Sequence, residues 1–241
     1  MPPKGVNVMR DVLFDIFDQD FVIHSKRELA EAVERYGFLP FFANSVAGFS
    51  VEEHIDRRLW FTSLEGPWEW KGPLIREYGF AYGKFFEKKA AFVSAAWFRE
   101  LANFRRDGYD FDALCDDGLA NFKDAQLYDL LNANAPILSK KLKRLGNYGK
   151  DGRKGFDTSI TRLQTQCYAL ISDFVYLRDK HGNPYGWGVA EYSTPEAFFG
   201  ETFTSHVYDH TPEESHALLL AHMKALFPRE SEKTIERFLR R

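Results

Sequence analysis

Two glutamines one residue apart, Gln164 and Gln166, are the side chains whose spacing most directly suggests chemistry in this sequence. An amide offers both a donor and an acceptor, so paired amides can position a water molecule or grip the edge of a nucleic-acid base. Residues two apart on a helix point in different directions, however. A catalytic or base-binding role for Gln164 and Gln166 is therefore one hypothesis, and an ordinary polar helix surface is the other.

A concentrated run of positive charge leads up to these glutamines. Eight Lys or Arg residues fall between positions 140 and 162 against only Asp151 and Asp157, which gives a local charge of +6. Such side chains neutralise phosphates, while the first half of a helix in the major groove reads bases. We expect phosphate contacts from Lys140, Lys141, Lys143, Arg144, Lys150, Arg153 and Lys154. We expect base contacts from Thr158, Thr161, Arg162 and Thr165. A solvated basic face is the alternative.

Histidines and carboxylates offer weaker candidates for chemistry. A metal needs three or more converging ligands, and the spacings of the C-terminal histidines suit separate helix faces instead. These histidines are His206, His210, His216 and His222. The aspartates between positions 107 and 117 could act as general acids or bases, but acids that alternate with glycine are common in turns and caps, so we expect a loop between residues 107 and 118. We expect no metal, no cofactor and no obligatory small molecule.

Three helices and a hairpin are the elements that must position the basic run. Helices are predicted over 122–131, over 139–145 and from about 157 to 170, followed by strands at 174–177 and 185–192. This order is typical of a winged helix-turn-helix. The third helix should bury a stripe at Ile160, Leu163, Cys167 and Leu170 against Leu127, Leu130, Leu142 and Leu145.

This assignment predicts a strand pairing and two contrasting substitutions. Phe174 and Val175 should pair with residues 188–192 across the turn. Leu163→Ala should empty a core site, whereas Arg162→Ala should leave stability within about 0.5 kcal/mol, because Arg162 lies on the expected outer face.

The rest of the chain reads as further helices around a second hairpin. Capping boxes at Ser25–Glu28 and Ser50–Glu53 predict helices to about residues 36 and 60. Residues 68–73 resemble an aromatic turn, 82–94 a hairpin and 95–106 a helix. We predict an α+β, mostly helical protein with tandem winged helix-turn-helix units. Its domains would be a winged-helix-like domain over 1–115, a winged helix-turn-helix over 116–194 and a C-terminal helical appendage over 195–241.

Composition restricts the class of protein. A chain of 241 residues, 44% of them hydrophobic, can bury a sizeable core. Its net charge of −3 gives no overall attraction to a polyanion, so nucleic-acid binding must depend on a local patch. Two distant cysteines, Cys115 and Cys167, argue against a disulfide framework or a structural zinc. No apolar run approaches the roughly 18 residues of a membrane span, so we expect a cytoplasmic location and no membrane partner.

Several short motifs together carry a family resemblance. They are Phe41–Ser45, Pro67–Lys71, Tyr82–Lys84, Lys88–Ser94, Asp116–Gly118, Leu163–Gln166 and Tyr185–Trp187. On these the chain resembles the bacterial AlkZ-related proteins over nearly its full length. The AlkZ and YcaQ DNA glycosylases, regarded as distant relatives of that family, are built from tandem winged-helix domains and excise damaged bases. The resemblance implies a multi-winged-helix fold, duplex DNA as the ligand and a role in DNA repair.

The same resemblance gives the glutamines a specific role. The glycosylases carry a catalytic glutamine, any residue, and then glutamine or aspartate, which Gln164 and Gln166 match. By that likeness they would position the attacking water, with an aromatic such as Trp187 or Tyr148 filling the base stack. We therefore expect a DNA-binding winged-helix protein. The alternatives are a DNA glycosylase that acts on alkylated bases and a winged-helix module that binds another protein.

Overall fold

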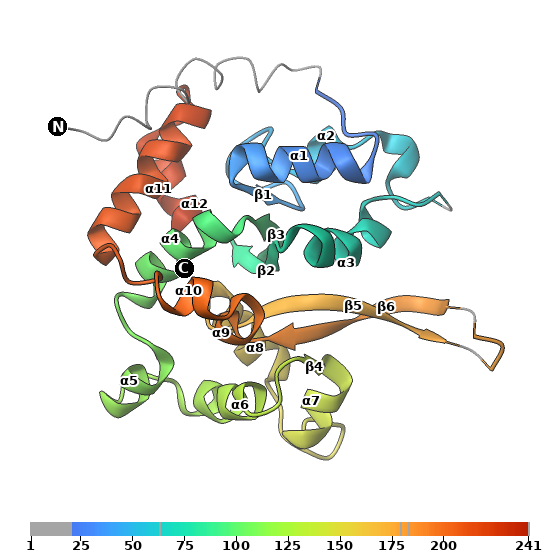
Figure 1. Ribbon diagram of the computed structural model, residues 1–241, viewed down its shortest axis with the longest axis vertical. Coiled ribbons are helices and arrows are strands. Elements are labelled where there is room, and N and C mark those ends of the chain that lie inside the picture. The colour runs from blue at the N-terminus through green and yellow to red at the C-terminus, as the bar shows by residue number, and fades with distance from the viewer. Residues whose placement is uncertain (1–20, 63, 179, 183, 241) are drawn as a thin grey trace.

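The computed structural model describes residues 21–240 except residues 63, 179 and 183. Helices and one antiparallel sheet share this part of the chain, which confirms the expected α+β class (Figure 1). The longer helices are α1 (Lys26–Tyr36), α3 (Pro67–Tyr78), α4 (Ala95–Arg106), α6 (Phe122–Asn132), α8 (Phe156–Thr165), α11 (Pro212–Leu226) and α12 (Glu232–Leu239). The shorter ones are α2 (Val51–His54), α5 (Phe111–Asp116), α7 (Ser139–Leu145), α9 (Pro195–Phe199) and α10 (Glu201–Thr204). None of the described helices combines the length and apolar character needed to cross a bilayer.

The described strands form one sheet in the order β1-β3-β2-β5-β6-β4. They are β1 (Phe38–Pro40), β2 (Ala81–Phe86), β3 (Lys89–Val93), β4 (Ile137–Leu138), β5 (Leu170–Arg178) and β6 (Pro184–Ser193). β2 and β5 meet at the centre, where Tyr82 pairs with Ile171. On each side of this junction the first strand along the chain pairs with the last, β1 with β3 and β4 with β6.

The order of elements is similar in the two parts of the chain that the junction joins. Apart from a short 3-10 turn at Arg57–Leu59, residues 26–93 and residues 122–193 each run helix, strand, helix, helix, strand, strand. The β5–β6 hairpin projects from the body of the molecule (Figure 1). As predicted, Phe174 and Val175 pair with Ala190 and Val189 in this hairpin.

Buried apolar side chains form two clusters. The larger one contains residues of α1, α3, α4 and β1–β3, and it extends to Leu219, Met223 and Phe238 in the C-terminal helices. The smaller one contains Leu127, Leu142 and Leu163 from α6, α7 and α8. The C-terminal helices therefore share a core with the first half of the chain.

Local capping signals explain the ends of α1. The Ser25 hydroxyl accepts a hydrogen bond from the backbone N–H of Glu28 at 3.2 Å, and the helix stops at Gly37 with φ of 77°. A Cβ atom at Gly37 would lie 2.1 Å from the Trp97 ring, so close packing as well as backbone conformation requires glycine there. The predicted helix at α4 and the predicted hairpin of β2 and β3 are also confirmed.

The helix that Ser50 caps is shorter than predicted. Ser50 does accept from the backbone N–H of Glu53, but α2 ends at His54 instead of continuing to Trp60. The chain becomes extended at the next residue because the backbone there pairs with Ile23, whose N–H donates to the His54 carbonyl at 2.7 Å. This contact is distant in sequence and overrides the local helix signal.

Two further segments contradict the sequence prediction. Residues 68–73, expected to form a turn, lie inside α3, where Pro67 occupies the first position and its missing N–H leaves no helical bond unmade. The expected loop between residues 107 and 118 contains α5, capped by Asp110, whose side chain accepts from the backbone N–H of Ala113 at 2.8 Å.

The third helix of the basic region ends earlier than predicted. α8 stops at Thr165, and Cys167 takes a φ of 63° that turns the chain into β5. Cys167 and Leu170 are buried, but in the larger cluster and not beside the other predicted stripe residues. Leu145, expected to face inward, is 45% exposed. Ile160 and Leu163 are buried as predicted.

Candidate nucleic-acid interface

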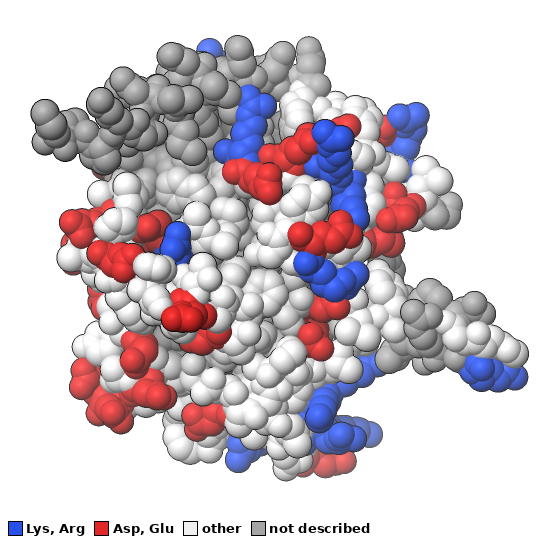
Figure 2. Space-filling view, in the orientation of Figure 1, with Lys and Arg blue, Asp and Glu red and all other residues white. Residues whose placement is uncertain are grey.

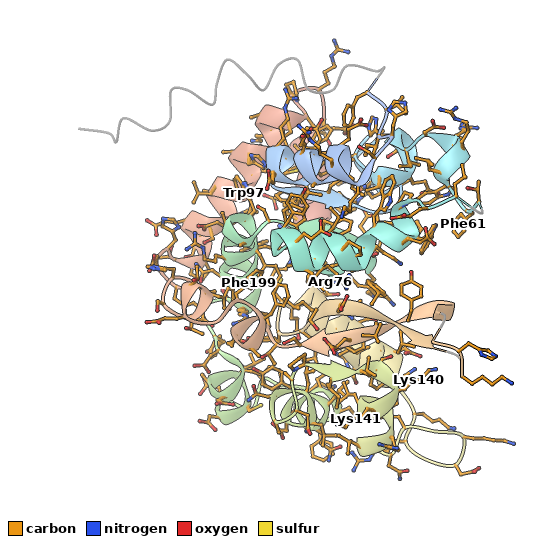
Figure 3. The ribbon with its side chains drawn as sticks, turned by 45° about the vertical axis from the view of Figure 1, so that its right-hand side comes forward. Phe61, Arg76, Trp97, Lys140, Lys141 and Phe199 are labelled. Carbon is orange, nitrogen blue, oxygen red and sulfur yellow. The ribbon has the colours of Figure 1, made fainter. Side chains whose placement is uncertain are left out.

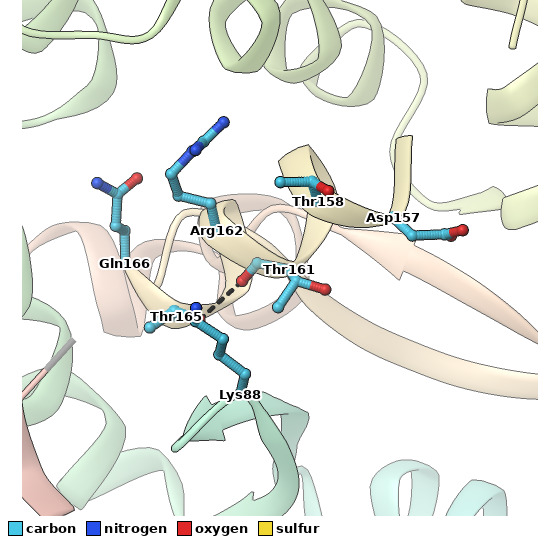
Figure 4. Close-up of a pocket in the computed structure, with 7 residues that line it drawn as sticks. All are labelled: Lys88, Asp157, Thr158, Thr161, Arg162, Thr165 and Gln166. Carbon is cyan, nitrogen blue, oxygen red and sulfur yellow. Dashed lines mark hydrogen bonds between the residues drawn. The ribbon is translucent and has the colours of Figure 1, made fainter. Parts of the chain in front are cut away.

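The outer face of α8 borders two adjoining hollows. One, of ≈520 Å³, is lined by Lys88, Asp157, Thr158, Thr161, Arg162, Thr165 and Gln166 (Figure 4). The other, of ≈430 Å³, is lined by Asn121, Phe122, Lys123, Gly155, Thr158, Ser159 and Arg162. Because Thr158 and Arg162 belong to both, we describe the two as one α8 groove. It lies between the β2–β3 turn and the first turn of α6.

The apolar period of α8 decides which side chains reach this groove. Ile160 and Leu163 face the smaller core cluster. Thr158 is exposed, and Thr161 and Arg162 are half-buried. Thr165, by contrast, is only 6% exposed, and its hydroxyl donates to the carbonyl oxygen of Thr161 at 2.8 Å. Thr158, Thr161 and Arg162 are thus the predicted base-contacting residues best placed to meet a ligand.

The two glutamines occupy different environments. Gln164 is 1% exposed. Its Oε1 accepts from the backbone N–H of Lys84 at 3.0 Å, and its Nε2 donates to the carbonyl oxygen of Ile160 at 3.0 Å. A Cβ atom at Gly83 would lie 3.0 Å from Oε1, so the glycine leaves room for this amide. Gln164 therefore fastens α8 to β2, and Gln166 alone of the pair lines the groove.

Lysines from outside the basic run reach the same groove. The ammonium group of Lys84 donates to the Thr161 hydroxyl at 3.3 Å, and Lys88 extends toward α8 from the β2–β3 turn (Figure 4). Lys123 lies in the first turn of α6. None of these three lysines was predicted as a contact, because they lie outside the basic run. The local sequence offers no signal that β2 pairs with β5 and brings Lys84 and the β2–β3 turn to α8.

Arg162 forms an ion pair with Asp124 of α6. Its Nε and Nη2 both donate to the Asp124 carboxylate, and the Nη2–Oδ1 distance is 2.9 Å. The Asp124 side chain is 4% exposed, whereas that of Arg162 is 40% exposed. The hydrogen bond to Asp124 raises the pKa of Arg162 above its usual value, although burial acts in the opposite direction. The guanidinium is therefore held as a cation in a fixed orientation.

The predicted phosphate-binding residues lie on α7 and on the loop before α8. Figure 3 places Lys140 and Lys141 on α7, and Figure 2 shows Lys and Arg gathered in this region, below the projecting hairpin. The exposed members are Lys140, Lys141, Arg144, Lys150, Arg153 and Lys154. Lys143 is half-buried and pairs with Asp157 at 3.2 Å. Arg153 donates to the Gln126 side chain at 2.9 Å, so part of this charge is engaged within the protein.

The aromatic candidates do not face the α8 groove in any described contact. Tyr148 is half-buried and packs edge-on against Phe156, with 5.3 Å between the ring centroids. The side chain of Trp187 lies outside the described part of the chain. Phe122, in contrast, is 73% exposed and lines the groove at the start of α6.

Each C-terminal histidine has its own partner. His206 contacts Asp209 at 2.9 Å, and His210 contacts Glu100 at 3.1 Å. His216 lies 3.2 Å from a Glu236 oxygen, and the His222 Nε2 donates to a backbone carbonyl at 2.7 Å. Across the described residues, no three His, Cys, Asp or Glu side chains gather in a way that could hold a metal ion.

Comparison with known protein families places the chain beside one of them. The model of a family described as AlkZ related matches residues 23–240. No curated protein and no solved structure matches the chain.

Proposed function

Because the chain belongs to the AlkZ-related family, we propose that it binds duplex DNA through the α8 groove and acts in DNA repair. One observation carries the proposal: the groove combines the outer face of α8 with lysines from both halves of the chain, Lys88 and Lys123. Lysine and arginine side chains that converge on a groove attract a polyanion and release its counterions. Because the whole chain has a net charge of −3, its attraction to DNA must come from a local concentration of positive charge such as this one.

The proposal includes a tandem winged-helix architecture. Its support is the order of elements, which is alike in residues 26–93 and 122–193, and the pairing of first and last strands in each part. In this reading α8 is the recognition helix of the second unit and the β5–β6 hairpin is its wing. The division at residues 115 and 194 belongs to the same proposal, with the C-terminal helices packed on the first unit.

The test is the salt dependence of DNA affinity. The wild-type protein should bind a short mixed-sequence duplex at low salt and lose affinity steeply as salt increases. The double variant Lys88→Ala/Lys123→Ala removes the two lysines that line the groove and should lower the slope of log affinity against log salt by about one to two. A matched control, Arg229→Ala/Lys233→Ala, removes the same charge from exposed positions at the C-terminal helices and should keep the wild-type slope. No binding at low salt would refute the proposal.

A second candidate is base excision, favoured by the position of Gln166. An enzyme needs a concave pocket beside its catalytic group, and Gln166 lines the ≈520 Å³ part of the groove. Its amide could orient a water toward a base that enters the groove. Gln164 would then support the site from behind through its hydrogen bonds to Lys84 and Ile160.

Base release from alkylated DNA tests the second candidate. Gln166→Ala should keep DNA affinity and lose about a hundredfold of the excision rate, the scale of a lost general-base contribution. Gln164→Ala should instead lower thermal stability, because both polar groups of Gln164 are bonded inside the protein. If the wild-type protein releases no base, excision is refuted and DNA binding is unaffected.

A further inference from the structure

Arg162 lies where the two hollows of the α8 groove meet, because its side chain lines both. The Asp124 carboxylate accepts from its Nε and from its Nη2, so one edge of the guanidinium is occupied. A guanidinium is planar and rigid, and two bonds to one carboxylate fix its plane as well as its position. Among the described residues, none accepts from Nη1, which leaves the other edge available to a ligand.

The burial of the Asp124 carboxylate costs free energy, and a gain in stability does not explain why a carboxylate occupies this position. Only 4% of its side chain is exposed. Taking a carboxylate out of water is expensive even with an arginine partner, and well-packed apolar residues in place of such a pair usually give equal or greater stability. Binding sites, in contrast, gain from a cation whose orientation is set before the ligand arrives.

We propose that Asp124 is a positioning residue that holds Arg162 for a ligand group with two adjacent acceptors, an inference that rests on the proposed binding of DNA. Two groups of DNA have this chemistry, the paired oxygens of a backbone phosphate and the O6 and N7 atoms of guanine. Lys88 and Lys123 line the two hollows on either side of Arg162 and add the positive charge that draws the DNA in.

The positioning role and simple electrostatics predict opposite signs for one substitution. By charge alone, removal of a carboxylate from a DNA-binding groove strengthens the binding of a polyanion. Asp157→Asn is the matched control, because Asp157 lines the same groove, is 83% exposed and does not contact Arg162. Asp124→Asn removes the same charge but keeps only one acceptor oxygen, so the pair of hydrogen bonds that fixes the guanidinium is lost. Positioning by Asp124 therefore requires that the two variants change affinity in opposite directions.

The experiment measures the affinity of the full chain for a short mixed-sequence duplex by fluorescence anisotropy. Asp157→Asn should bind a few times more tightly than wild type, and Asp124→Asn roughly tenfold more weakly. Arg162→Lys keeps the charge but loses the planar fork, so it should also lose roughly tenfold. Tighter binding by Asp124→Asn, or wild-type affinity in Arg162→Lys, overturns the proposal.

Two further measurements identify the ligand group and separate effects on folding from effects on binding. A duplex of A·T pairs alone distinguishes the two groups: equal losses on both duplexes identify a phosphate, and a loss confined to the guanine-containing duplex identifies the guanine edge. Thermal melting tests the fold of each variant. If Asp124→Asn does not fold, the affinity of Arg162→Lys tests the proposal instead. This variant keeps a cation beside the buried Asp124 carboxylate and should therefore fold. Absence of wild-type binding to either duplex refutes the proposed function and this inference together, whereas wild-type binding with similar gains in both aspartate variants refutes only the positioning role.

Discussion

Lys88 has a backbone conformation that favours glycine. In the turn between β2 and β3, Glu87 and Lys88 have φ of 49° and 60°, and Phe86 pairs with Lys89 across them. Two-residue hairpin turns with positive φ at both central positions are usually built from Asn and Gly, and other residues cost about 1–2 kcal/mol each there. The chain accepts this strain at a position whose side chain lines the α8 groove. Strain retained at such a position is typical of a binding site.

Lys88→Gly should therefore separate stability from binding. Glycine adopts a positive φ without strain, which stabilises the folded state, but it also has more conformational freedom in the unfolded chain, which opposes folding. The first effect should equal or exceed the second, so the free energy of unfolding should rise by up to about 1 kcal/mol. DNA affinity should fall, with the salt slope lower by about one. Urea unfolding and anisotropy measure the two effects. Glu87→Gly relieves a similar strain without removing a cation, so it should not weaken DNA binding; equal weakening by both variants would contradict a contact from Lys88.

Arg162→Ala should be more destabilising than the sequence alone predicts. On an outer helix face the substitution would be nearly neutral, but Arg162 is the partner of the buried Asp124 carboxylate. Its loss leaves that carboxylate without a cation, and we expect a decrease of about 1–3 kcal/mol in the free energy of unfolding, below the value for a fully buried pair because Arg162 is partly exposed. Urea unfolding gives the value. The double variant Arg162→Ala/Asp124→Ala should recover part of the loss, and no recovery would argue against the unpaired charge as its cause.

Among the elements, α8 shows how far an apolar pattern predicts structure. The spacing of Ile160 and Leu163 correctly predicted a helix with one buried face, and the turn residues after it correctly predicted a hairpin. The same spacing continues to Leu170, so the sequence contains no signal for the end of the helix at Thr165. That end depends on the φ of 63° at Cys167, which packing imposes and residue type does not favour.

The groove was predicted less completely than the helix that borders it. The outward threonines and Arg162 follow from helical periodicity, and the structure places Thr158 and Thr161 in the groove. Lys88 and Asp124 could not be predicted, because contacts between distant parts of the chain bring them to α8. A local sequence pattern defines which face of an element is polar, but tertiary packing decides what meets that face.

The core position of α8 gives a prediction with a matched control. Leu163 is fully buried in the smaller cluster, so Leu163→Ala should lower the free energy of unfolding by about 2–5 kcal/mol. Leu145→Ala makes the same change at a side chain that is 45% exposed and should cost no more than about 0.5 kcal/mol. Urea unfolding of both variants provides the comparison. Similar costs at the two positions would contradict the burial of Leu163 against α6 and α7.

At the scale of the whole molecule, Arg105 connects the two halves to the C-terminal helices. It is fully buried in α4, and its Nη1 donates to the carbonyl oxygen of Thr165 at 2.8 Å, at the end of α8. Its Nε donates to the carbonyl oxygen of Leu239 at 3.2 Å, at the end of α12. The last carbonyls of a helix lack partners within it, and a cation suits the negative end of the helix dipole. One side chain thus fixes α8 relative to α4 and α12.

His222 should make the stability of the whole molecule depend on pH, because of where it is buried. It lies in α11, where its ring stacks on Trp97 with 3.9 Å between centroids and its Nε2 donates to the carbonyl oxygen of Tyr36 at 2.7 Å (Trp97 is labelled in Figure 3). This contact joins the C-terminal helices to α1. Burial lowers the pKa of His222 below its usual value near 6.5, although the bond to Tyr36 acts in the opposite direction.

The sign of the pH effect follows from which state binds the proton more readily. In the unfolded chain His222 takes up a proton as the pH falls through about 6.5, whereas in the folded chain it stays neutral to a lower pH. The unfolded state therefore binds more protons below that pH, and His222 should contribute a loss of up to about 1.4 kcal/mol per pH unit between its unfolded and folded pKa values. His222→Gln keeps a donor for the Tyr36 carbonyl but cannot titrate. Urea unfolding from pH 7 to pH 5 should therefore show a smaller loss of unfolding free energy in this variant than in wild type. At pH 7 the variant should itself be less stable, because it lacks the ring stack on Trp97. An unchanged slope in His222→Gln would contradict this prediction. It would show that groups other than His222 cause the loss of stability at low pH, and that folding does not depend on a neutral His222 ring between α11 and α1.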